Sequence, residues 1–309
     1  MATLTNHARR DGLTCLALAT LFLAGCSINR LASDAVADAL LEGGTAYSGD
    51  EDIVLVGDAV PFVLKTIESL LEGNPEHDGL LLAAASGFTQ YAYVYVHQPA
   101  DAIELVDVSR GYAMRDRALR LYLRARDYGL RGLDTRHPGF IERLHRDPER
   151  ALADCNTKDI ALLYWTTVST AAAIGLGKDD PALLGQLPII EAMARRALTL
   201  DESFSDGDLH VFMISYEMAR PGGGEVAALQ ARMHFERAVA LSGGNKAAAY
   251  VALAESHSVA QQDRAEFERL LNTTLTLDID NRPEWRLANR VSQERARWLL
   301  DHAHHFFSE

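Results

Sequence analysis

The side chains that could do chemistry in this chain are few, and their spacing matches no catalytic pattern. The sequence contains no G-x-S-x-G, G-x-x-x-x-G-K, H-E-x-x-H or Cys-x-x-Cys motif. The run Gly222-Gly223-Gly224 follows a proline and a predicted helix, so we interpret it as a loop and not as a phosphate-binding turn. No residue near Cys155 in the sequence would activate its thiol as a nucleophile. We therefore predict no catalytic residues and no enzymatic activity.

Histidines are the other candidates for chemistry, as metal ligands. His302, His304 and His305 lie close to the end of the chain, beside two phenylalanines, and this position is typical of a helix end or an exposed tail. His210 precedes an apolar helix face, which predicts a half-buried core position. We predict neither a metal site nor a cofactor.

Cys26 is the residue for which the sequence predicts a specific modification. It follows Leu23-Ala24-Gly25, at the end of a stretch with a basic start and an apolar run from Leu13, which is built like a secretory signal. A cysteine directly after the small residues resembles the bacterial lipobox. This resemblance implies that residues 1–25 are removed and that diacylglycerol is attached to the Cys26 thiol. The alternative is a short transmembrane anchor, but the apolar core of about eleven residues is roughly half of what spans a bilayer.

These signals divide the chain into three parts. Residues 1–25 are the predicted lipoprotein signal peptide, residues 26–50 a lipidated N-terminus with a lead-in segment, and residues 51–309 a single all-α domain. Ser27 follows the cysteine, whereas an Asp at that place marks retention in the inner membrane of many Gram-negative bacteria. We therefore expect the protein at the periplasmic face of the outer membrane.

Charge and cysteine content limit the partners and the forces that hold the domain. The net charge is −13, and it becomes about −14 when the signal peptide with its two Arg and one Asp is removed. An acidic surface of this size argues against nucleic-acid binding and against attachment through a polybasic patch. Cys15 leaves with the signal and Cys26 is lipidated, so Cys155 has no partner for an intramolecular disulfide. The packed core must therefore hold the domain.

Helical periodicity dominates after residue 27. Within Asp208–Met218 the apolar side chains fall at i, i+3, i+4 and i+7, and Pro221-Gly222 follows, which predicts one helix with an apolar face. Lys158–Ile174 is a second predicted helix, whose small residues 171–173 would let a neighbouring helix approach closely. No Asn-Gly or Asp-Gly hairpin turn separates alternating strands. We predict an all-α fold.

The C-terminal third of the chain also repeats itself. Similar helix endings occur at 197–201, 238–241 and 274–278, and Phe235-Glu236-Arg237 recurs as Phe267-Glu268-Arg269. An earlier copy ends at 67–71, before Asn74-Pro75. A period near 34 residues with such endings is typical of tetratricopeptide repeats, whose helix pairs stack to form a continuous core.

The segment Leu80–Val96 is almost uncharged and rich in tyrosine. Alternation of three tyrosines at its end is compatible with a strand, but its position after the 74–75 turn favours a buried helix. If the domain encloses a ligand cavity, aromatic residues of the least polar helices would form its wall, since such cavities are mostly apolar with a few polar groups. The candidates are Tyr91, Tyr95, Tyr164 and Trp165. The alternative for each of them is a place in the plain hydrophobic core.

Seven segments, taken in order, resemble the TRAP transporter T-component family. The likeness runs from about residue 31 to 307 and rests on Leu80–Tyr93, Tyr164-Trp165, Lys178–Pro181, Gly207–His210, Arg220–Gly223, Phe235–Ala238 and Arg286–Asn289. The resemblance implies a lipid-anchored periplasmic protein of tetratricopeptide-like helix pairs around a central pore. It also implies a non-enzymatic accessory of a tripartite ATP-independent periplasmic transporter, which forms homotrimers, docks the solute-binding P subunit and passes or holds a small hydrophobic ligand. Two alternatives remain: an envelope scaffold lipoprotein without a small ligand, and a hydrolase within the same helical shell.

Overall fold

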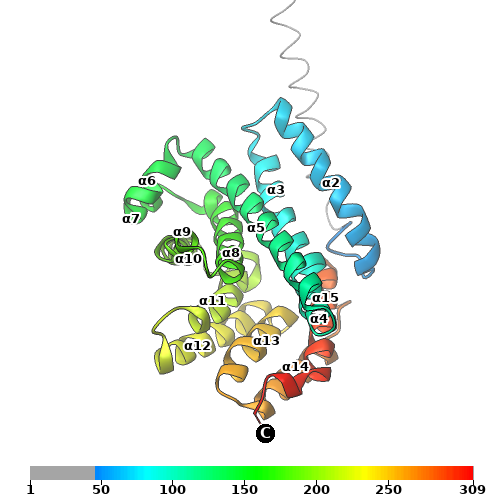
Figure 1. Ribbon diagram of the computed structural model, residues 1–309. Coiled ribbons are helices and arrows are strands. Elements are labelled where there is room, and N and C mark those ends of the chain that lie inside the picture. The colour runs from blue at the N-terminus through cyan, green and yellow to red at the C-terminus, as the bar shows by residue number, and fades with distance from the viewer. Residues whose placement is uncertain (1–45, 309) are drawn as a thin grey trace, which may run out of the picture.

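The computed structural model describes residues 46–308, and this part of the chain contains helices and turns but no strand. The prediction of an all-α fold is confirmed (Figure 1). The α-helices are α2 (Ile53–Gly73), α3 (Asp78–Ala92), α4 (Gln98–Glu104), α5 (Val108–Arg136), α6 (Phe140–Arg146), α7 (Pro148–Ala153), α8 (Ile160–Leu176), α9 (Pro181–Leu184), α10 (Leu187–Leu200), α11 (Asp208–Ala219), α12 (Gly224–Ser242), α13 (Ala247–Leu253), α14 (Arg264–Thr276) and α15 (Arg286–Asp301). Two π-helical turns, η1 (Tyr93–His97) and η4 (Ala254–Ser258), continue α3 and α13. The 3-10 turns are η2 (Thr157–Asp159), η3 (Phe204–Gly207), η5 (Pro283–Trp285) and η6 (Ala303–His305).

The predicted signal peptide, the Cys26 lipidation site and most of the lead-in segment lie outside the described residues. They stay predictions.

Several helices begin at an aspartate that caps them. Asp52 accepts hydrogen bonds from the backbone N–H groups of Val54 and Leu55, each at 3.0 Å. Asp107 caps α5 and Asp263 caps α14 in the same way. A carboxylate at this position satisfies amide groups that have no partner inside the helix and favours the positive end of the helix dipole. The local sequence therefore determines where these helices begin.

Elements predicted from periodicity lie where they were expected. The predicted helices 208–218 and 158–174 correspond to α11 and α8. The repeated endings at 197–201, 238–241 and 274–278 fall at the last turns of α10, α12 and α14. The segment Leu80–Val96 is helical throughout, as α3 and η1, so the alternating tyrosines do not form a strand. A regular repeat stack and a central pore stay predictions.

The helices follow one another along a curved path that brings α15 back beside α2 (Figure 1). Within this path α15 packs against α2. The N–H of Leu287 donates to the carbonyl of Ser48 at 3.0 Å, and the Arg286 guanidinium donates to the carbonyl of Gly49 at 2.9 Å. These contacts join the first and last helices, so the interior is enclosed by helices from both ends of the described chain.

The two central helices, α5 and α8, approach each other closely. Gly129 of α5 faces Thr166 of α8, and a Cβ atom on Gly129 would lie 2.1 Å from the Thr166 Oγ1. Thr166 turns this hydroxyl to the Leu162 carbonyl of its own helix, at 2.6 Å. Glycine is therefore required at 129 for the observed contact. The small residues at 171–173 of α8 pack against an earlier part of α5, around Leu119 and Leu123.

One helix of the described residues, Thr157–Leu176, is long and apolar enough to cross a membrane by length and composition alone. More than half of this window is buried inside the domain, and Leu162 and Leu163 have no exposed surface. Its contacts with α3, α5 and α10 make it the central core helix of the domain.

Candidate functional site

The interior of the helical path contains a cavity of about 320 Å³, which we call the central cavity. Side chains of α3, α8, α11, α13 and α15 form its wall, together with both π-helical turns of the described residues. The wall is mostly apolar, with Val168, Val211 and Val251 among its members. This volume lies at the lower end of the range of ligand pockets, about 300–1,000 Å³. A small molecule therefore fits the central cavity.

Tyr93, the first residue of η1, shows that the central cavity is accessible space. The residue is 42% exposed, although it lies deep in the domain. The two facts agree because the exposed part of Tyr93 faces the central cavity. Burial, with the nearby Glu255 charge, raises the pKa of its phenol to about 12. Because π-helical turns are rare and occur often at functional sites, the position of Tyr93 supports a functional cavity.

A charged cluster forms one side of the central cavity. The Arg295 guanidinium of α15 donates from Nε and Nη2 to Oε1 of Glu255, at 2.9 and 2.6 Å. Arg295 Nη2 also lies 2.9 Å from Oδ2 of Asp101 in α4. Burial raises the pKa of Glu255, and Arg295 opposes this effect. Burial alone would lower the pKa of Arg295, but the charge and hydrogen bonds of Glu255, together with the Asp101 charge, raise that pKa overall. The cluster thus combines two carboxylates with one guanidinium.

A second cavity, of about 260 Å³, lies between α2, α3 and α15. Tyr91 and Tyr95 line it, with ring centroids 5.4 Å apart. The Tyr95 hydroxyl donates to the carbonyl of Ile53 at 3.0 Å, and Gly57 of α2 makes room for the Tyr95 ring, since a Cβ there would lie 2.5 Å from it. Gln90 lines both cavities, so the second cavity adjoins the central cavity.

The four predicted wall residues therefore divide between the two cavities. Tyr164 and Trp165 line the central cavity, with their rings 4.9 Å apart and edge to face. Tyr91 and Tyr95 line the second cavity instead. Whether any of the four contacts a ligand stays a prediction.

Sequence reasoning missed the polar residues of the central cavity. Tyr93 escaped because a π-helical turn changes which side chains share a helix face, and periodicity assumes a regular helix. Glu255 had a usable signal, since it is the single charge at the end of the apolar stretch Ala247–Ala254. Arg295 lies in a helix with many charged residues, where nothing in the sequence distinguishes it from solvent-exposed neighbours.

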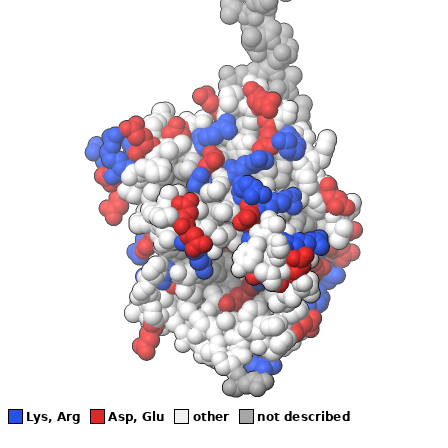
Figure 2. Space-filling model, in the orientation of Figure 1, with Lys and Arg blue, Asp and Glu red and all other residues white. Residues whose placement is uncertain are grey.

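Lys and Arg side chains gather along α5 on the face shown in Figure 2. Exposed arginines recur there at intervals of three, four or seven residues: Arg110, Arg117, Arg120, Arg124 and Arg131. Three of them cover aromatic rings, as Arg117 lies 5.8 Å from the Tyr91 ring centroid, Arg124 5.3 Å from that of Phe88 and Arg131 5.3 Å from that of Tyr128. The protein thus carries a local band of basic side chains on α5 despite its acidic net charge. Some of these side chains cover aromatic rings.

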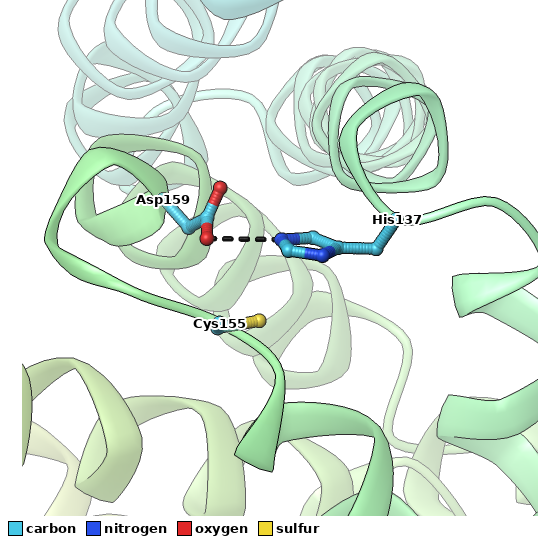
Figure 3. Close-up of side chains that lie close together, drawn as sticks. All are labelled: His137, Cys155 and Asp159. Atoms are coloured by element: carbon cyan, nitrogen blue, oxygen red, sulfur yellow. Dashed lines mark hydrogen bonds and ion pairs between the residues drawn. The ribbon is translucent and has the colours of Figure 1, made fainter.

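Three residues with the chemistry of a metal site or a nucleophile meet where α5 ends and α8 begins (Figure 3). The ligand atoms of His137, Cys155 and Asp159 lie within 4.8 Å of one another, although no sequence motif places a histidine beside Cys155. Asp159 accepts hydrogen bonds from the Asn156 N–H at 2.8 Å, from His137 Nε2 at 2.9 Å and from Arg136 Nη1 at 3.1 Å. We call these five residues the Asp159 cluster.

The Asp159 cluster has a structural role, since it connects the end of α5 to the start of α8. Both oxygens of Asp159 already accept hydrogen bonds, and the adjacent Arg136 charge disfavours a cation at the same place. Burial raises the pKa of the Cys155 thiol to about 11, and the residue is 2% exposed. A thiol of this kind is a poor nucleophile and a poor metal ligand at neutral pH. The geometry thus gives Cys155 no role as a nucleophile.

The histidines considered in the sequence analysis have structural surroundings. His210 is buried, as a core position requires, and its Nδ1 lies 2.8 Å from Nδ1 of His234. Burial and the neighbouring imidazole lower the pKa of His234 to about 4. His302 caps the end of α15, and the other two C-terminal histidines lie in η6, which agrees with the predicted helix end.

Comparison with known proteins gives one family and one relative. A family model described as TRAP transporter T-component matches residues 49–307. An uncharacterized protein of Treponema pallidum (strain Nichols) is 30% identical over 315 residues, which span 95% of this chain and 97% of that protein.

Proposed function

Because the chain belongs to the TRAP transporter T-component family, we propose that it is a lipid-anchored periplasmic subunit that docks the solute-binding P subunit of such a transporter and holds a small ligand in its central cavity. The family match spans almost all described helices, and it carries the accessory role in a transporter. The central cavity is the observation that carries the ligand-holding part of the proposal. A rigid helical shell suits this role, because it excludes bulk water without forming a catalytic group.

The anchor and the location complete the proposal. Lipidation at Cys26 would attach the protein to the periplasmic face of the outer membrane, and several acyl chains together suffice for stable attachment. Mass spectrometry of the mature protein from membranes should show the acylated Cys26, and Cys26→Ser should abolish the added mass. Wild-type protein that is soluble and unmodified in the periplasm would contradict the anchor.

Trimer formation is part of the same proposal, and α12 offers a surface that supports it. Val226, Leu229 and Met233 follow one another at helical spacing and are largely exposed. Apolar side chains on one exposed face are typical of protein interfaces. Native mass spectrometry of the mature domain would report the oligomeric state, and a purely monomeric protein at micromolar concentration would contradict the trimer.

Binding of the P subunit is the central test. The solute-binding P subunit of the transporter should bind the purified domain in isothermal titration calorimetry. Alanine variants at Tyr91, Tyr95, Tyr164 and Trp165 should retain most of their stability and change partner binding or the retention of a co-purified ligand. If all four variants are severely destabilised and binding per folded molecule is unchanged, the four residues belong to the plain core.

The scaffold alternative makes a different prediction for the same experiment. A scaffold would bind its partner equally well when the central cavity is blocked, for example by Ser215→Trp. Ser215 of α11 lines the central cavity, so a tryptophan at this position should occupy part of the cavity. Unchanged partner binding and no ligand in native mass spectra would favour the scaffold without a ligand.

A further inference from the structure

The charged cluster of the central cavity continues away from the cavity wall to Arg115 and Glu104. Arg295 contributes one positive charge, and the carboxylates of Glu255 and Asp101 both contact it. Asp101 also pairs with Arg115, at 3.0 Å, which in turn lies 2.6 Å from Glu104. Taken together, these five side chains hold three carboxylates and two guanidinium groups. Of these side chains, Glu255 and Arg295 line the central cavity.

Glu255 is the member of this cluster that faces the open space. Its Oε1 accepts both hydrogen bonds from Arg295, and no donor within residues 46–308 is found for its second oxygen, Oε2. The Glu255 side chain is 27% exposed and that of Arg295 is 12% exposed, although Glu255 lies deep in the domain. As Glu255 lines the central cavity, its exposed part faces that space. The Oε2 atom is thus accessible, and it is free to accept a hydrogen bond from a ligand in the cavity.

The rest of the wall suits a cation. Tyr93, Tyr164, Trp165 and Phe212 all line the central cavity, and the faces of such rings attract positive charge, the indole most strongly. An anionic ligand would have only Arg295 to bind, and that guanidinium already contacts two carboxylates. A neutral ligand would leave the Oε2 atom of Glu255 without a cationic partner.

We propose that the central cavity takes a small apolar molecule that carries a protonated amine, whose N–H group donates to Glu255 Oε2 while its apolar part contacts the aromatic wall. This inference deepens the proposed function, since it rests on the central cavity holding a ligand. The π-helical turns η1 and η4 serve this purpose by turning Tyr93 and Glu255 into the same space.

The test compares three probes of nearly equal size and different charge: 2-phenylethylamine, 2-phenylethanol and 3-phenylpropanoate. Isothermal titration calorimetry with the wild-type mature domain should give about tenfold tighter binding of the amine than of the alcohol, and the weakest binding for the carboxylate. Glu255→Gln keeps the shape and an acceptor for Arg295 but removes the charge, so it should bring the amine down to the affinity of the alcohol. Glu225→Gln, on the exposed face of α12, is the matched control and should leave all three affinities unchanged.

Each other outcome contradicts the inference in a distinct way. Equal affinities for the three probes, or tighter binding of the carboxylate, overturn the ammonium ligand while ligand holding stands. Selectivity that survives Glu255→Gln shows that another group recognises the amine. If none of the probes binds, ligand holding itself fails and the inference fails with it, whereas a loss of P-subunit binding alone leaves the inference intact. The wild-type comparison needs no variant, so it is decisive even if Glu255→Gln folds poorly.

Discussion

The central cavity and the Asp159 cluster both bring titratable side chains into the interior, and they differ in what surrounds those side chains. In the Asp159 cluster, N–H groups from three residues satisfy one carboxylate, and hydrophobic side chains enclose the rest. In the central cavity, one oxygen of Glu255 is paired and the other faces accessible space. The presence of titratable or metal-ligating residues is therefore insufficient to identify a functional site. Open polar atoms next to accessible volume distinguish a candidate binding site from a structural joint.

Truncating an aromatic residue in each region should give the largest difference. Phe140 has no exposed surface and packs near His137, with ring centroids 6.1 Å apart. Phe140→Ala should lower the free energy of unfolding by about 3–5 kcal/mol, because a fully buried ring leaves a void. Trp165→Ala should cost less than about 2 kcal/mol, since part of its surface already borders the central cavity. Urea denaturation measures both values, and equal losses would contradict the distinction.

Removing one charge from each region should separate them further. Asp159→Asn leaves Arg136 and His137 without their shared carboxylate and should cost about 3 kcal/mol of unfolding free energy at neutral pH, as the loss of one partner of a buried ion pair does. Glu255→Gln should cost about 1 kcal/mol, because Arg295 keeps Asp101 and the amide oxygen still accepts a hydrogen bond. A larger loss for Glu255→Gln would show that the charged cluster is primarily structural.

Thiol labelling tests whether the Asp159 cluster is closed. With Cys15 and Cys26 replaced by serine, the remaining thiol is Cys155. Its pKa of about 11 instead of 9.0 should reduce the thiolate fraction at neutral pH, and thus the labelling rate, by about 100-fold relative to a free thiol. Burial slows the reaction further. The reaction with a maleimide should become fast only in denaturant, and rapid labelling of the folded protein would show an open, reactive site.

Stability should depend on pH with opposite sign for the carboxylates of Asp159 and Glu255. We expect this effect to be smaller than those of the substitutions above. Burial by itself would raise the pKa of Asp159, but its hydrogen bonds from Asn156, His137 and Arg136 lower it below 3.8. The folded state therefore releases this proton more easily, and the stabilisation is present above about pH 4 and is lost as the pH falls further. Burial raises the pKa of Glu255 above 4.5, so its contribution is most favourable below that value and declines as the pH rises through the raised pKa.

Melting temperatures from pH 3 to pH 8 measure both effects. The stability advantage of the wild-type protein over Asp159→Asn should shrink toward pH 3. The wild-type protein should lose stability relative to Glu255→Gln as the pH rises above about 5. The same sign for both variants would contradict the contrast between a satisfied and an unsatisfied carboxylate.

The sequence alone was sufficient for the fold class, the family and much of the helix layout. Local signals decide these properties. The i, i+3, i+4, i+7 pattern of α11 and the asparagine–proline turn before α3 both act over a few residues. The fold class also follows from the order of residues, because no long alternation of apolar and polar residues predicts strands. The motifs that resemble the family are similarly local, and their order along the chain is visible without a structure.

The candidate site depended on contacts that the sequence does not display. Tyr164 and Trp165 were chosen for being aromatic and apolar, and they line the central cavity, but the same reasoning placed Tyr91 and Tyr95 with them, and these line the second cavity. All four positions look alike in sequence because aromatic residues fill cores and line cavities for the same reason, their large apolar surface. Only the packing of the helices decides which helix faces line a cavity.

The sequence by itself thus determined that the chain is all-α, that it belongs to its family and where several helices begin or end, since capping, turns and periodicity are properties of neighbouring residues. The tertiary structure alone decided that Glu255 and Arg295 meet Tyr93 across the central cavity and that His137, Cys155 and Asp159 form a closed joint. Residues 255 and 295 are 40 positions apart, and Tyr93 lies much farther from both. Contacts at such separations arise when whole helices pack, and the burial that packing imposes decides whether a charged group is satisfied or left open to a ligand.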